Sequence, residues 1–158
     1  GHGYGNWSSL YNFTIPSRVV LTLENDDVAF GVQGLGQSAS TNETDGPTPF
    51  IVRNDGNIPM DISNISVKDA LWEHPSAQIP SRYLRIRAAN ASETGSFNWS
   101  ASRTDWINVS WNNSMMIRGL RYSDDADEAV LDVAIQVPWE ETPGPKQAIL
   151  VFFGKDAK

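Results

Sequence analysis

The chain has 158 residues, of which 40% are hydrophobic and 20% charged, and its formal net charge is −7 at pH 7. We expect one domain with a substantial core. The acidic balance argues against nucleic-acid binding, which needs clustered Lys and Arg. The lack of cysteine excludes disulfides, thiolate metal sites and Cys nucleophiles. No apolar run is long enough to span a bilayer, so we expect no transmembrane segment.

The first residues, beginning Gly-His-Gly without Met, suggest a mature product whose signal peptide has been removed, or else the remnant of a cleaved tag. Residues 5–15 alternate like a strand with one apolar face. The apolar face comprises Trp7, Tyr11, Phe13 and Ile15, and the other parity carries Asn6, Ser8, Asn12 and Thr14. We therefore separate an N-terminal extension, residues 1–16, from a body, residues 17–158.

Along the body, alternating apolar and polar residues recur between clusters of Gly, Pro, Asn and Asp. The predicted strands cover 17–25, 28–32, 50–54, 58–72, 82–90, 96–101, 105–111, 114–122, 130–138 and 147–154. A change of parity within 58–72 predicts a β-bulge near Ser63. Residues 147–154 are apolar on both parities, which predicts a central strand. About nine or ten short strands indicate an all-β sandwich.

Eight of the twelve asparagines open an N-x-[ST] triplet, whereas chance placement of Ser and Thr gives about two. The triplets begin at Asn6, Asn12, Asn42, Asn64, Asn90, Asn98, Asn108 and Asn112. Several lie inside predicted strands, on the parity opposite the apolar residues, where a glycan would face water. The pattern predicts a secreted or surface-displayed N-glycoprotein whose sheet exterior is largely covered by sugar.

No sequence motif for catalysis is evident: the two histidines lack the context of a Ser-His-Asp site, and no P-loop or H-E-x-x-H is present. The acidic stretch with Asp124, Asp125, Asp127 and Glu128 has the hard oxygen ligands that Ca²⁺ prefers, but it also suits a solvated turn. Trp99, Trp106 and Trp111 are expected to pack in the core, with a sugar-binding face as the alternative. We expect no enzyme and no required cofactor.

Three segments resemble a known family. They are "VVLTLENDDVAFGVQGLGQ", "PFIVRNDGNIPMDIS" and "DEAVLDVAIQVPWEETPGPKQAILVFF", and the resemblance covers roughly residues 18–154. In this order they resemble the TasA/camelysin-like secreted β-sandwich proteins, in particular the archaeal bundling-pilus and thread subunits. Camelysin-type members have been described as proteases, but no protease motif is present here.

The resemblance implies a jelly-roll or Ig-like sandwich that lacks one strand. The N-terminal segment of one subunit would fill the groove of the next, giving an extracellular homopolymer for adhesion or biofilm contact. Trp7, Tyr11, Phe13 and Ile15 would be the plugs, and Pro16 would mark the hinge. The alternative function is a monomeric glycosylated Ig-like binding module at the cell surface.

Overall fold

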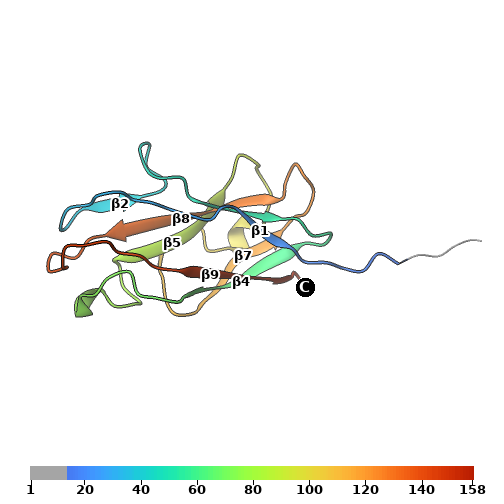
Figure 1. Ribbon diagram of the computed structural model, residues 1–158. Coiled ribbons are helices and arrows are strands. Elements are labelled where there is room, and N and C mark those ends of the chain that lie inside the picture. Colours follow the sequence, from blue (N-terminus) through green and yellow to red (C-terminus); the bar gives the residue numbers. More distant parts are fainter. Residues whose placement is uncertain (1–13) are drawn as a thin grey trace, which may run out of the picture.

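The computed structural model describes residues 14–158, apart from the side chains of residues 114 and 115. These residues form two antiparallel sheets packed face to face, an all-β sandwich as predicted (Figure 1). The strands are β1 (Leu21–Asn25), β2 (Ser38–Ser40), β3 (Phe50–Asn54), β4 (Met60–Val67), β5 (Leu84–Asn90), β6 (Ile107–Asn108), β7 (Asn113–Leu120), β8 (Glu128–Gln136) and β9 (Leu150–Asp156). Two short 3₁₀ helices, η1 (Pro75–Ala77) and η2 (Trp99–Ala101), lie in connections.

The larger sheet has the order β1-β3-β8-β5-β6, and β2 pairs with the far half of β8. The smaller sheet has the order β7-β4-β9. The inward faces of both sheets supply the core, whose fully buried members include Val52, Ile62, Ile86, Ile117 and Leu131. Their alternation with polar residues along each strand explains why the chain forms a two-layer structure.

The bulge predicted near Ser63 is confirmed, because the register of β4 shifts between Ile62 and Asn64 against both of its neighbours. The shift turns Ile65 and Val67 inward after Ile62, so both halves of β4 bury their apolar residues. The prediction for residues 50–54 matches β3.

Several strand predictions are wrong or shifted. The predicted strand 105–111 contains only the two residues of β6, and β2 lies outside the predicted strands. Residues 28–32 form no strand, and residues 96–101 contain η2 instead. The C-terminal strand is not central: within residues 14–158, β9 pairs with β4 alone and lies at the edge of its sheet. Its second apolar parity, Val151 and Phe153, is exposed. The pattern of apolar residues along a strand indicates which side chains are buried, but it does not show how many neighbouring strands pair with it.

Candidate functional site

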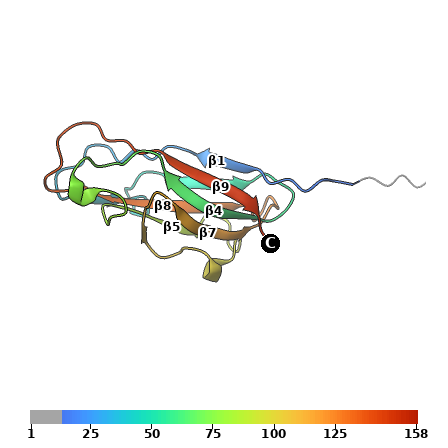
Figure 2. The ribbon, with the colours of Figure 1, turned by 90° about the horizontal axis from the view of Figure 1, so that it is seen from below.

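The sandwich has one open side, where the edge strands of its two sheets lie next to each other (Figure 2). β1 is the edge of the larger sheet and β9 is the edge of the smaller one. In the part of the chain that the structure describes, each pairs along one side only. The backbone N–H and C=O groups along the other sides are therefore free to pair with an added strand.

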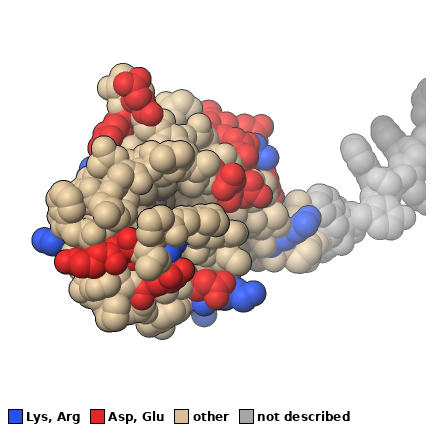
Figure 3. Space-filling view, turned by 60° about the vertical axis from the view of Figure 1, so that its left-hand side comes forward, with Lys and Arg blue, Asp and Glu red and all other residues tan. Residues whose placement is uncertain are grey.

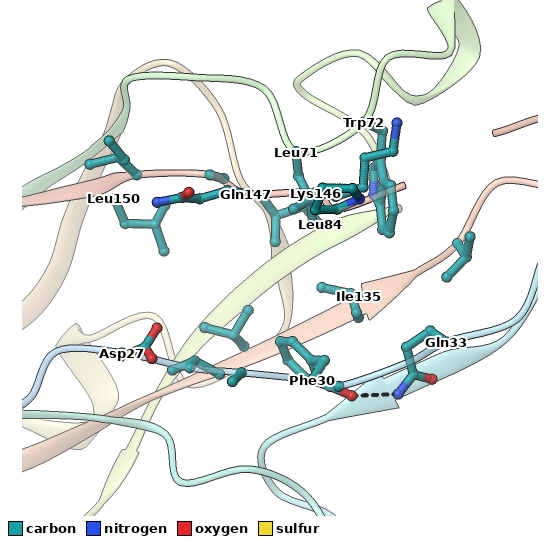
Figure 4. Close-up of a pocket in the computed structure, with 18 of the residues that line it drawn as sticks. Asp27, Phe30, Gln33, Leu71, Trp72, Leu84, Ile135, Lys146, Gln147 and Leu150 are labelled. Atoms are coloured by element: carbon teal, nitrogen blue, oxygen red, sulfur yellow. Dashed lines mark hydrogen bonds between the residues drawn. The ribbon is translucent and has the colours of Figure 1, made fainter. Parts of the chain in front are cut away.

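A groove of about 910 Å³ runs between these edges and continues between residues 26–35 and 141–150. Leu84 of β5 and Ile135 of β8 form its floor. Leu150 of β9 and Phe30 of the opposite segment lie on its walls, and all four side chains point toward the same space (Figure 4). Phe30, Leu71 and Leu150 are only partly buried. The body thus leaves core-like apolar surface uncovered.

The groove is closed near the end of the molecule where the N-terminal segment leaves. A Cβ on Gly154 would come within 2.6 Å of Met60 Sδ, so the glycine makes room for Met60 of β4. The same position lies 3.4 Å from Leu21 Cβ, an ordinary contact that places β1 beside β9. Phe50 and Phe152 meet edge to face there, with ring centroids 5.4 Å apart.

At its other end the groove opens to solvent, and Figure 3 shows this hollow between largely uncharged walls with acidic residues around it. A loop after β8 borders this mouth. Glu141 is buried and accepts hydrogen bonds from the backbone N–H of Glu73, at 3.2 Å, and of His74, at 3.1 Å. Lys146 Nζ lies 2.7 Å from Glu141 and 3.0 Å from Glu73. These contacts fix the loop on the adjacent connection.

Burial raises the pKa of Glu141, but the Lys146 ammonium and the two backbone N–H donors outweigh it, so the pKa lies below its usual value. The pKa of Lys146 is raised, chiefly by its hydrogen bond to Glu141. Both groups are therefore charged at neutral pH.

The N-terminal segment leaves the body at a fixed point. Asn57 Oδ1 accepts the Arg18 N–H at 2.7 Å, and Asn57 Nδ2 donates to the Pro16 carbonyl at 3.0 Å. Gly56 lies against the same stretch, because a Cβ there would come within 2.3 Å of the Arg18 carbonyl. Beyond this anchor Ile15 is 70% exposed, and the chain runs away from the sandwich at the end opposite the groove mouth (Figure 1).

Comparison of the chain with protein-family models, curated proteins and solved structures gives no match. The resemblance to TasA/camelysin-like proteins therefore remains a prediction, and the groove is interpreted from its own geometry. Within residues 14–158, no helix has the length and apolar character needed to cross a bilayer.

Most predicted glycosylation sites in the described residues lie at the surface. Exposed positions are Asn42, Asn90, Asn98, Asn108 and Asn112. Asn64 is half-buried in β4, and its Oδ1 has no hydrogen-bond partner among the described residues. Asn6 and Asn12, like the proposed plugs Trp7, Tyr11 and Phe13, lie outside the described residues.

The acidic stretch forms the turn before β8. Asp124 and Asp125 are exposed, whereas Asp127 is buried. The N–H groups of Asp127 and Glu128 donate to Glu93 Oε2 at 2.9 and 3.1 Å. Within the described residues, no three His, Asp or Glu side chains are grouped so as to hold a metal ion. Calcium binding remains an untested prediction.

The tryptophans depart from expectation. Trp99 and Trp111 are exposed by 48% and 50%, and Trp106 lies half-buried on the outer face of the larger sheet. Trp72, which was not singled out from the sequence, is the buried tryptophan among residues 14–158 and lines the groove. The groove itself was also missed, although the strand-like alternation of 28–32 marks one of its walls.

Proposed function

We propose that this protein is the subunit of an extracellular N-glycosylated filament, in which the N-terminal segment of one copy fills the groove of the next. The single observation that carries the proposal is the uncovered apolar groove between two free strand edges. A strand laid there would supply ladder hydrogen bonds to β9 and apolar side chains to the groove.

The segment outside the structure has suitable chemistry. Residues 1–17 contain no Asp, Glu, Lys or Arg. From Tyr11 to Ile15 every second residue is apolar, and Trp7 has the same parity. Ile15, the last of these side chains, makes little contact with its own body. An uncharged alternating strand matches a groove whose floor is apolar, and its other parity would leave Asn6 and Asn12 facing water.

The geometry favours a second copy as the acceptor. The anchor at Asn57 and the groove mouth lie at opposite ends of the molecule. A donor that leaves at one end and an acceptor that opens at the other form a heterologous contact. Such a contact repeats along an open filament rather than closing as a dimer.

Deletion of residues 1–15 should abolish filaments in electron micrographs and leave a folded monomer, because both sheets and the whole described core lie after residue 15. Filaments that persist without these residues would refute the donor-strand mechanism. A full-length chain that stays monomeric under all conditions would favour the alternative, a surface binding module.

A matched pair on β9 tests the acceptor. Leu150 faces the groove and its neighbour Val151 faces outward. Leu150→Asp places a charge in the groove and should stop assembly, whereas Val151→Asp should assemble like the unmodified chain. Circular dichroism checks that both variants fold. Equal assembly by the two variants would exclude this groove as the acceptor.

A further inference from the structure

The outer face of the larger sheet carries an aromatic side chain held between two cations. Trp106 lies beside β5, with the guanidinium carbon of Arg87 4.7 Å and that of Arg85 5.7 Å from its ring centroid. Arg87 is fixed in turn by Asp132, at 3.1 Å, and Asp132 accepts the Thr41 hydroxyl at 2.9 Å. The ring is thus rigidly placed on a face that otherwise meets solvent.

A recess of about 200 Å³ lies beside this ring. The strand register places the recess, because Ala134 of β8 pairs with Ser40 on one side and with Arg85 on the other. These three residues form one row across the outer face of the larger sheet. The small side chain of Ala134 lines the bottom of the recess, between the loop after β2 and the Arg85 and Trp106 side chains. Arg85 Nε is buried there and has no hydrogen-bond partner among the described residues. This donor is closed off from solvent, so the surface that the recess offers to a ligand is the Trp106 ring and the polar side chains of its rim.

Asn42, which opens an N-x-[ST] triplet, stands on the rim of the same recess. Its Oδ1 accepts the Ser40 hydroxyl, and its backbone N–H donates to Ser40 Oγ at 3.3 Å. These bonds orient the side chain, while Asn42 Nδ2, the atom that a glycan would modify, makes no hydrogen bond within the described residues. A sugar attached there would begin at the edge of the recess.

We propose that the recess is the docking site for the first sugar of an N-glycan on Asn42. Pyranose rings carry an apolar face of C–H groups and a rim of hydroxyls. The apolar face would pack on Trp106, and the hydroxyls would face the polar side chains that line the recess, such as Ser38 and Glu43. The docked glycan would cover the half-buried ring and hold the loop after β2 against β8. The inference rests on the glycosylation in the proposed function, but not on polymerisation.

Glycopeptide mass spectrometry and hydroxyl-radical footprinting of the native glycosylated protein test this site. Asn42→Gln removes the glycan with little change to the fold, because Asn42 is exposed. Oxidation of Trp106 should rise several-fold in Asn42→Gln and stay unchanged in the control Asn98→Gln, which removes a glycan from the N-cap of η2 in the connection between β5 and β6. Unchanged oxidation of Trp106 in Asn42→Gln, or an unmodified Asn42 in the native protein, would overturn the inference.

Enzymatic release of sugars gives a second measurement. In the native fold the Asn42 glycan should be released several-fold more slowly than the glycan on exposed Asn98. Trp106→Ala should remove that difference, whereas Trp99→Ala should not. Equal release at the two sites before substitution would contradict docking. Filament formation is scored separately, so a loss of docking with intact filaments leaves the proposed function standing.

Discussion

At the scale of single residues, burial decides what an asparagine does in this protein. Asn54 is fully buried, and its amide bonds the carbonyls of Ile58 and Leu120 and the N–H of Gly56. It joins β3, the following turn and the end of β7; the bond to the Leu120 carbonyl is buried and the other two are partly buried. Asn57, three residues later, makes two similar bonds near solvent. The chief difference is that water can reach the hydrogen-bond partners of Asn57 but not the buried partner of Asn54.

Alanine substitutions at these two positions should therefore have unequal effects. Asn54→Ala leaves the buried Leu120 carbonyl and the partly buried Ile58 carbonyl and Gly56 N–H unpaired, and should lower the free energy of unfolding by about 2–4 kcal/mol. Asn57→Ala should cost about 1 kcal/mol, because water satisfies the freed groups. Urea denaturation of both variants measures the difference, and equal losses would contradict this explanation.

At the scale of elements, two connections contain buried carboxyl groups with opposite responses to pH. The pKa of Glu141 is lowered in the folded protein, so its stabilising contribution is present above the ordinary Glu pKa and is lost as pH falls through the folded pKa. Burial and nearby Glu93 raise the pKa of Asp127. Its charged form opposes folding at neutral pH, and this cost disappears as the carboxyl takes up a proton on acidification.

The neutral variants should consequently change stability in opposite directions. At about pH 7, Glu141→Gln should be less stable than the unmodified protein and Asp127→Asn more stable; both differences should shrink by about pH 4. Chemical denaturation at the two pH values measures them. Asp127→Asn is informative because the Asp127 carboxylate accepts no hydrogen bond within the described residues. If both variants changed stability in the same direction at about pH 7, the opposite roles given to Glu141 and Asp127 would be wrong.

Sequence patterns predict those strands in which apolar and polar residues alternate along the strand itself. The bulge in β4 is predicted by the change of apolar parity within that strand, and the register shifts there against both neighbouring strands. Strand β3 is predicted by a short apolar run that ends at the turn residues Asp55-Gly56-Asn57. The edge position of β9 depends on which strands pair with it in the folded sheet, and the local sequence of β9 does not encode its pairing partners. The same reason explains the error at 28–32, a strand-like run that borders a groove instead of pairing.

The outward position of Trp106 is likewise not predictable from its local sequence, because it depends on contacts with Arg85 and Arg87 of β5. By contrast, the exposure of most N-x-[ST] sites was predictable, since it follows from alternation and turns within each segment. Local pattern thus locates candidate modification sites, whereas the groove and the docking recess arise from long-range strand pairing.

At the scale of the whole molecule, the sandwich has an open apolar groove, so under the proposed function its stability should depend on what occupies that groove. The part after residue 15 contains the described core but leaves Phe30, Leu71 and Leu150 partly uncovered. A bound segment would shield these side chains from water, and the hydrophobic gain would be measured as added stability of the acceptor.

A synthetic peptide of residues 1–16 should therefore stabilise the chain that lacks residues 1–15. When the free peptide is about 100 times its Kd, the gain should be about 2.7 kcal/mol, seen as a rise in Tm. A Phe13→Asp peptide should give no rise, whereas an Asn12→Asp peptide, altered on the opposite parity, should behave like the original. Stabilisation by the Phe13→Asp peptide would mean that the apolar parity does not enter the groove.

The opposite placement of the Asn57 anchor and the groove mouth has a consequence for populations of filaments. Under the proposed function, every filament ends with an idle donor at one tip and an empty acceptor at the other. A subunit without residues 1–15 can receive a donor but cannot pass one on. Small admixtures of it would terminate growth at a single tip, so the mean filament length would follow the mixing ratio.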